Sequence, residues 1–433
     1  MKNGALGVKP FAIMLIAAVV VSLGLAACGG SSDTSGGSTG GGSEGSEAAS
    51  PSEEGSETAS SGETGAIECV NGAVTIGIAK SKSGSATFFE VAGTNGFKVA
   101  VAKINEEGGL KGCPIKTIEG DNKSEPAVGG QVAKQLIEEG AQILVVPDDL
   151  DQGIAAAKAG SGAGILTLSL AASAPEFAPA VGPDFFSSGI STYQLGEAMA
   201  NFALEKGWKT AFYANDPGLA YFTGQEKAFN ETYEAGGGEI VGTDKIDSLG
   251  GQTDFSSTVS KISQANADVV IPQGVYPQVG GLVKQIRSSG IDTPIIGSTT
   301  LDTRELPKQV GPSNLKDVFY VTQVYYNGAG EDKKSDPAME EFTEAYEKQF
   351  GHFPEQTNAP TSYQSFLAIN EALQEKSVTD AATASEAISA QKNVKVPGGT
   401  LVKWEEGHAV WDPSIVGFTP TGGFELIKVL SAE

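Results

Sequence analysis

Three carboxylates follow a short apolar run in the first half of the chain. Asp148, Asp149 and Asp151 lie in "VVPDDLDQG", directly after a strand predicted at 142–146. Carboxylates at the end of a strand could bind a cationic ligand group or a metal ion. They could equally cap the helix that begins near Gly153, because Asp favours the positive end of a helix. No further metal ligand is evident, so we predict neither a metal site nor a cofactor.

Aromatic side chains follow predicted strands in both halves of the chain. They are Phe88, Phe89, Tyr221, Tyr276 and Tyr325. An apolar wall with a few polar groups is typical of a small-molecule pocket. The pattern therefore indicates a binding cleft.

Enzyme chemistry finds little support in the sequence. The two histidines, His352 and His408, lie in polar, turn-like surroundings, where we expect surface positions. The pattern G-x-S-x-G occurs at 36–40 and 41–45, without the strand and helix that a nucleophile elbow requires. Neither a phosphate-binding loop nor a Cys/His cluster is present. We predict that the protein is not an enzyme.

The elements that would position these residues alternate along the chain from Val74 onward. The predicted strands are 74–79, 115–119, 142–146 and 165–170 in a first series, and 210–214, 239–243, 268–272 and a short strand near Ile295 in a second. Amphipathic helices lie between them. This order predicts an α/β fold with two Rossmann-like parallel-sheet lobes. Ligands of open α/β sheets lie at the carboxyl ends of the strands, so two facing lobes would form a cleft.

The first 28 residues are typical of a secretion signal. Lys2 and Lys9 precede the apolar run 11–21, and small residues lead to Cys28. "LAAC" (25–28) resembles a bacterial lipobox, which implies a lipid anchor on the Cys28 sulfur. The alternative is an ordinary signal peptide with a chance cysteine. Residues 29–66 are Gly/Ser/Glu-rich and predict a disordered tether that spans about 30–40 Å.

The two remaining cysteines, Cys69 and Cys113, each precede a predicted strand. Outside the cytoplasm such an even pair suggests a disulfide. If the two strands are adjacent and parallel, both cysteines lie at the same edge of the sheet. Two buried free thiols are the alternative.

The charge balance bears on possible partners. The chain has 53 acidic and 29 basic residues and a net charge of −24. Nucleic-acid binding requires basic patches, so we predict no nucleic-acid partner. High solubility is the simplest consequence of this acidity.

Four stretches carry a resemblance to a known family: "AVAKINEEGGLKG" (100–112), "LSLAASAPEF" (168–177), "QTDFSSTVSKI" (252–262) and "GLVKQIRSSGIDTPIIG" (281–297). In order and spacing they resemble the type I solute-binding proteins of branched-chain amino acid (Leu/Ile/Val-binding-like) ABC importers, from about residue 72 to 433.

The resemblance implies two lobes joined by three crossovers, near 188–192, 321–325 and 397–403. Lobe 1 would comprise 67–190 and 323–398, and lobe 2 would comprise 191–322 and 399–433. The implied protein is an extracytoplasmic monomer, anchored by lipid on the periplasm-facing side or the outer face of the cell membrane. It would capture a small-molecule ligand and deliver it to ABC permease subunits driven by a cytoplasmic ATPase.

The resemblance also implies ligand-binding residues. "AASAP" matches the family's carboxylate-holding loop, which selects Ala171 through its backbone and Ser173. Phe89 and Tyr221 match cleft aromatics, and Val275 or Tyr276 falls where another tyrosine is frequent.

Two positions depart from the amino-acid binders. Asp149 or Leu150 stands where they have a serine for the ligand carboxylate, and Thr299 stands near their acid for the ammonium. A carboxylate facing a carboxylate would be repelled. The predicted ligand is therefore a small polar or aromatic organic solute, which could be amino-acid-like, an amide or an aromatic acid and could carry a cationic group.

Three alternatives remain open. The same fold could act as a ligand-sensing receptor that signals, and neighbouring genes for a permease and an ATPase would distinguish transport from sensing. A secreted enzyme lacks a nucleophile–base pair. An orphan member of the family could have lost ligand binding.

Overall fold

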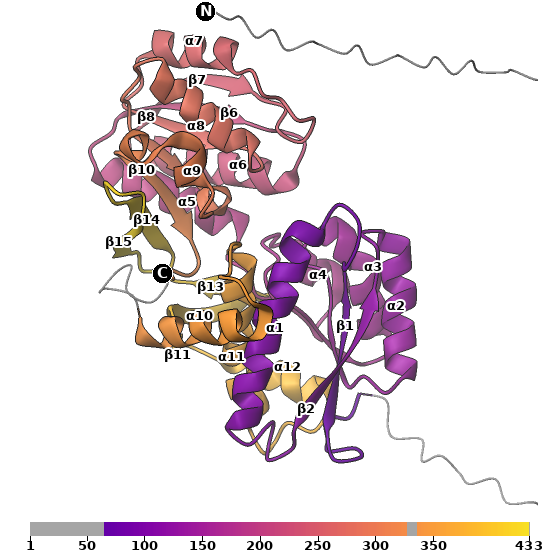
Figure 1. The fold of residues 1–433 in the computed structure, drawn as a ribbon. Coiled ribbons are helices and arrows are strands. Elements are labelled where there is room, and N and C mark those ends of the chain that lie inside the picture. Colours follow the sequence, from indigo (N-terminus) through magenta and orange to yellow (C-terminus); the bar gives the residue numbers. More distant parts are fainter. Residues whose placement is uncertain (1–64, 327–335, 433) are drawn as a thin grey trace, which may run out of the picture. The chain divides into compact units, whose positions relative to one another are not determined.

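Two mixed sheets, each mostly parallel and flanked by helices, organise the chain (Figure 1). The computed structural model describes residues 65–326 and 336–432. The predicted α/β class with two lobes is confirmed. Cys28 and nearly all of the predicted tether lie outside the described residues, so their roles stay predictions.

The first sheet has the order β11-β12-β13-β5-β4-β3-β1-β2. Its strands are β1 (Val74–Lys80), β2 (Ile115–Asp121), β3 (Ile143–Val145), β4 (Leu166–Ser169), β5 (Phe185–Ser187), β11 (Val394–Val396), β12 (Gly399–Glu405) and β13 (His408–Trp411). Every residue of β3 and β4 is buried, as expected for apolar strands covered on both faces.

In the described part of the chain, seven helices accompany this sheet. They are α1 (Thr87–Glu106), α2 (Pro126–Glu138), α3 (Leu150–Gly162), α4 (Phe177–Val181), α10 (Pro337–Phe350), α11 (Asn358–Leu373) and α12 (Ala381–Ala390). Helices α1 and α11 pack closely because α1 has glycine at Gly96. A Cβ there would lie 1.9 Å from the Ala359 carbonyl oxygen. This contact holds the C-terminal section against the first lobe.

The second sheet has the order β15-β14-β10-β9-β8-β6-β7. Its strands are β6 (Thr210–Asn215), β7 (Glu239–Lys245), β8 (Val269–Gln273), β9 (Ile295–Gly297), β10 (Val318–Thr322), β14 (Ser414–Phe418) and β15 (Phe424–Val429). Its helices are α5 (Thr192–Glu205), α6 (Ala220–Ala235), α7 (Ser256–Ala265), α8 (Gln278–Ser288) and α9 (Leu306–Val310), with short 3-10 turns at Thr299–Leu301 and Pro312–Leu315.

The third passage between the sheets lies later in the chain than we predicted. The sequence assigned 399–433 to the second lobe, but β12 pairs with β11 and β13 pairs with both β12 and β5. A tight turn causes this, since Glu406 and Gly407 both adopt positive φ and fold β13 back onto β12. The chain reaches the second sheet only between Trp411 and Ser414.

The predicted disulfide between Cys69 and Cys113 is confirmed, with 5.8 Å between the two Cα atoms. It forms because β1 and β2 are adjacent and parallel, with Val74 opposite Ile115. Both cysteines therefore lie beyond the same end of this strand pair.

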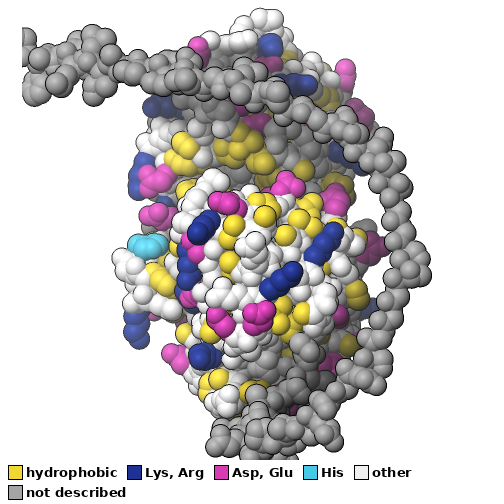
Figure 2. Space-filling model, turned by 90° about the vertical axis from the view of Figure 1, so that its right-hand side faces the viewer, with side chains coloured by type: hydrophobic (Ala, Val, Ile, Leu, Met, Phe, Trp, Pro, Cys, Tyr) yellow, Lys and Arg dark blue, Asp and Glu magenta, His cyan; other side chains and the backbone are white. Residues whose placement is uncertain are grey.

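Charged side chains are dispersed on the surface that Figure 2 shows. Acidic and basic groups alternate across this face, and it carries no continuous basic patch. Within 65–326 and 336–432, no helix combines the length and apolar character that a membrane span needs.

Candidate ligand-binding site

A cavity of about 440 Å³ brings together the residues that the sequence singled out. Its lining includes Phe89, Asp149, Ala171, Ser173, Tyr221, Tyr276 and Thr299, the full predicted set. These residues follow β1, β3, β4, β6, β8 and β9. The carboxyl ends of parallel strands meet at one edge of each sheet, which explains why positions so distant in sequence converge. Their contact with a ligand stays a prediction.

Tyr325, one of the aromatic residues that follow predicted strands, lies outside this cavity. Tyr325 is buried in the core of the second lobe, where its hydroxyl donates to the Phe424 carbonyl oxygen at 3.1 Å. Phe88 does line the cavity, and its side chain is 56% exposed. The sequence placed Tyr325 after a strand correctly but could not show which way its side chain points.

The wall from the second sheet carries a hydroxyl pair. The Tyr221 and Thr299 hydroxyl oxygens are 2.6 Å apart. Burial raises the pKa of Tyr221, so its hydroxyl stays protonated and available as a donor. Tyr276 adds a partly buried ring on the same side. This wall is thus aromatic, with hydroxyl groups and one buried carboxyl group, Asp302.

Asp149 serves the first turn of α3. It is the N-cap residue, and its carboxylate accepts the Gln152 backbone N–H at 3.1 Å. The helix-cap interpretation is therefore confirmed, while a ligand contact of the same carboxylate stays a prediction. Burial raises the pKa of Asp149 above its usual value, and the neighbouring carboxylates of Asp151 and Asp148 add to this.

Beneath the first-sheet wall lies a buried ionic cluster of Lys80, Glu90 and Asp148. The Lys80 ammonium is 2.5 Å from an Asp148 carboxylate oxygen and 3.1 Å from a Glu90 oxygen. Glu90 also accepts the Asp148 backbone N–H at 2.8 Å. The three side chains are at most 2% exposed. A buried charge is costly unless it is paired, so the three groups stabilise one another.

The protonation of this cluster follows from burial and pairing. Burial alone lowers the pKa of Lys80, but the two carboxylates outweigh it and leave this pKa above the usual value. Burial raises the pKa of Glu90 to about 7, against the opposing effect of Lys80. Helix α1 accommodates the cluster through Gly93, where a Cβ would lie 2.7 Å from the Asp148 carboxylate and 3.0 Å from the Lys80 ammonium.

Asp148 also reaches the loop after β4. The Ala171 backbone N–H donates to its carboxylate at 3.2 Å, and the Ser169 hydroxyl lies 3.5 Å from the same oxygen. The backbone donor at Ala171, which the resemblance assigned to a ligand carboxylate, is thus already occupied by a carboxylate of the chain. The sequence identified the acidic cluster but not its buried partner Lys80, which lies at the end of β1.

A hydrogen-bonded network joins the first two passages between the sheets to α11 and to the turn before β12. The Ile190 backbone N–H donates to the Gln323 side-chain oxygen at 2.7 Å, and the Gln323 amide donates to Gln364 at 2.9 Å. Gln364 in turn donates to the Pro397 carbonyl oxygen at 3.1 Å. Ile190 and Gln323 also line the cavity. This network was not evident from the sequence because its members are far apart along the chain.

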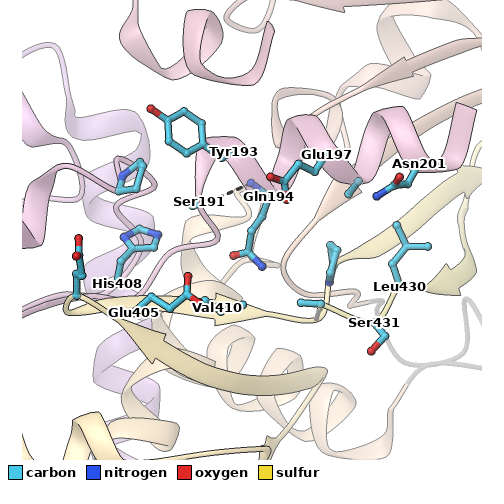
Figure 3. A pocket seen from close by; sticks show the side chains of 15 residues that line it. Ser191, Tyr193, Gln194, Glu197, Asn201, Glu405, His408, Val410, Leu430 and Ser431 are labelled. Carbon is cyan, nitrogen blue, oxygen red and sulfur yellow. Dashed lines mark hydrogen bonds between the residues drawn. The ribbon is translucent and has the colours of Figure 1, made fainter. Parts of the chain in front are cut away.

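His408 is not the surface residue that we predicted. It is 4% exposed in β13, and burial lowers its pKa to about 4, against smaller opposing effects of Gly189 and Glu405. His408 and Glu405 line one wall of a second cavity of about 930 Å³, opposite Gln194 and Glu197 of α5 (Figure 3). The other histidine, His352, is exposed as predicted. None of the predicted ligand-binding residues lines this second cavity.

Metal ligands do not gather in the described part of the chain. Between 65 and 432, apart from 327–335, no three His, Cys, Asp or Glu side chains are placed to hold an ion. Of the acidic residues after β3, Asp149 instead caps α3 and Asp148 belongs to the ionic cluster.

Comparison with protein families matches residues 73–417 to the periplasmic binding proteins. The chain is 25% identical over 337 residues to the Leu/Ile/Val-binding protein homolog 3 of Brucella melitensis. That alignment covers 77% of this chain and 88% of the Brucella protein. It is 27% identical over 220 residues to the Leu/Ile/Val-binding protein of Escherichia coli K12. That alignment covers 50% of this chain and 59% of the E. coli protein.

Solved structures share the fold. One is the branched-chain amino acid transporter substrate binding protein of Streptococcus pneumoniae in complex with isoleucine, with a TM-score of 0.68, 23% identity, and coverage of 83% of this chain and 99% of that chain. Another is an ABC transporter solute binding protein of R. palustris in complex with benzoate. Its TM-score is 0.66 at 19% identity, and the match covers 83% of this chain and 96% of that chain.

The ionic cluster predicts a large loss of stability when its cation is removed. In Lys80→Met, two buried carboxylates lose their partner, and we expect the free energy of unfolding in urea to fall by about 3–5 kcal/mol. The control is Lys82→Met, because Lys82 is 48% exposed and pairs with Glu119 at 2.9 Å. The control should lose at most about 1 kcal/mol. Equal losses in the two variants would contradict a stabilising role of the cluster.

The buried His408 predicts a pH dependence of stability. Its pKa is about 4 in the folded protein and about 6.5 in the unfolded chain, so between these values only the unfolded state binds the proton. Stability should therefore decrease as pH falls from about 6.5 to 4, by about 3 kcal/mol relative to a His408→Gln variant. Urea unfolding at several pH values measures this difference. His352→Gln is the control and should follow the parent profile, and parallel profiles for His408→Gln would refute the expectation.

Proposed function

The chain belongs to the periplasmic binding protein family, and from this premise we propose that it is a lipid-anchored substrate-binding protein that delivers a small organic solute to an ABC permease. Members of the branched-chain amino acid transporter type bind substrates outside the cytoplasm, and they are not enzymes. The observation that carries the proposal is the 440 Å³ cavity, which residues following strands of both sheets line together.

The fold provides a mechanism for ligand capture. In the described part of the chain the polypeptide passes between the two sheets three times, and the Ile190–Gln323 hydrogen bond links the first two of these passages. Rotation of one lobe against the other about these passages would open and close the cavity. A ligand favours the closed form only by binding it more tightly than the open form, and the closed form is then what the permease receives.

The ligand we propose is a small polar organic solute. Relatives of similar fold were solved with isoleucine and with benzoate, so this fold accepts both amino acids and aromatic acids. In this chain Phe89, Tyr221 and Tyr276 supply ring surfaces, and Ser173 and Thr299 supply hydroxyl groups. The set suits an apolar body with few polar groups.

The anchor and the tether complete the proposal. Cys28 would carry lipid, and residues 29–66 would let the body operate close to the membrane surface. The disulfide between Cys69 and Cys113 supports an oxidising compartment outside the cytoplasm.

Ligand capture predicts a stability increase with the right solute. At about one hundred times its dissociation constant, a ligand should add about 2.7 kcal/mol and raise the melting temperature by a few degrees. The panel comprises branched, aromatic and basic amino acids, amides, polyamines and aromatic acids. Tyr221→Ala should weaken binding of any hit at least tenfold, about 1.4 kcal/mol. Tyr193→Ala, outside this cavity, is the control, and the absence of any hit would count against a binding function.

The anchor predicts membrane association that depends on one sulfur. In the parent protein, expressed in a bacterium that processes lipoproteins, we expect the chain in the membrane fraction with lipid mass on Cys28. Cys28→Ala should move it to the soluble fraction without lowering ligand affinity. Membrane retention of Cys28→Ala would exclude the lipid anchor. Solute uptake that persists after deletion of the gene would favour the sensing alternative over transport.

A further inference from the structure

The ionisable side chains that line the cavity are all acidic. Among the described residues that line it, the ionisable carboxyl groups are Asp148, Asp149, Asp151, Glu176 and Asp302, and the lining includes no lysine, arginine or histidine. Asp151 and Glu176 are exposed and Asp149 is half-buried. A ligand that enters the cavity therefore meets carboxylates and finds no basic side chain on its wall.

Two cations beside lining residues are already engaged: Lys80 contacts Asp148, and Arg304 follows Thr303 in the chain. The Lys80 ammonium lies between Glu90 and Asp148. The Arg304 guanidinium lies 4.2 Å from the Phe424 ring centre and 4.7 Å from that of Phe353, and it donates to the Tyr326 carbonyl oxygen at 3.2 Å. Neither lines the cavity, so neither can neutralise an incoming anion without leaving its partners.

The backbone donor on the first-sheet wall is engaged as well. The Ala171 N–H donates to the Asp148 carboxylate at 3.2 Å. An anionic ligand that approached this N–H would compete with Asp148 and be repelled by it. Asp148 cannot move aside at low cost, because it is held by Lys80 at 2.5 Å and its side chain is fully buried.

The remainder of the wall suits a cation with an apolar body. Phe88, Phe89, Tyr221, Phe222 and Tyr276 present aromatic rings to the same cavity. The face of an aromatic ring attracts cations, and the carboxylates of Asp149 and Asp151 can accept hydrogen bonds from an ammonium group.

We propose that the cavity selects a small organic ammonium ion with an apolar body and discriminates against carboxylates of the same shape. The inference rests on the proposed function, since it names the substrate class of that same cavity. The ammonium group lies against Asp149 and Asp151 at the start of α3, and the apolar body lies against the aromatic rings.

The test uses matched probes and the full chain in detergent solution. Isothermal titration calorimetry compares benzylamine, benzamide and benzoate, and then isopentylamine, isovaleramide and isovalerate. We expect each amine to bind at least tenfold more tightly than the carboxylate of its set. In Asp149→Asn, which keeps a side chain suited to capping α3, amine affinity should fall about tenfold while amide affinity is unchanged. Asp151→Asn, at an exposed position, should likewise lower amine affinity while amide affinity is unchanged, and it leaves the Asp149 cap of α3 intact.

The outcomes separate this inference from the proposed function. Asp254→Asn alters an exposed acid outside the cavity and should leave all affinities unchanged. Carboxylates that bind as tightly as the amines, or more tightly, would overturn the inference and leave the binding function intact. Equal amine affinity in Asp149→Asn, Asp151→Asn and the parent would also overturn it. Failure of all six probes and of isoleucine to bind would count against the proposed function itself.

Discussion

The burial of one ammonium group between two carboxylates constrains much of the first lobe. Lys80 ends β1, Glu90 lies in the first turn of α1, and Asp148 follows β3. Because none of these charges could remain buried alone, the three elements must keep their relative positions. The glycine at Gly93 and the hydrogen bond from Ala171 follow from this requirement. The cluster therefore determines both the packing and the polarity of the cavity wall.

The topology of the sheets supplies the second constraint. Parallel strands connected by helices place the residues after each strand at one edge. The two sheets thereby supply one wall each, with most of the carboxylates and a helix N-terminus on the first, hydroxyl groups and Asp302 on the second, and aromatic rings on both. The same scaffold accommodates amino acids or aromatic acids in relatives.

The strands and the cavity could be predicted because their signals are local. Apolar runs such as 74–79 and 142–146 mark buried strands whose neighbours in the sheet follow from the alternation with helices. The short strand β5 was not predicted, since three residues carry too little pattern. The location of β13 depended on a turn at Glu406 and Gly407 that returns the chain to the first sheet. His408 was misplaced for the same reason, because its burial results from that return.

The sequence alone determined the α/β class, and it indicated the pairing of Cys69 with Cys113 and several of the residues that line the cavity, because each depends on local pattern or on the strand order that the pattern implies. Only the tertiary structure decided how those residues are used. It showed that Asp149 caps a helix, that Asp148 belongs to an ionic cluster with Lys80, and that Tyr325 points into the core. Such assignments depend on which groups from distant segments come into contact and on how far that contact excludes water. The sequence pattern does not specify these contacts, because they form only when the chain has folded.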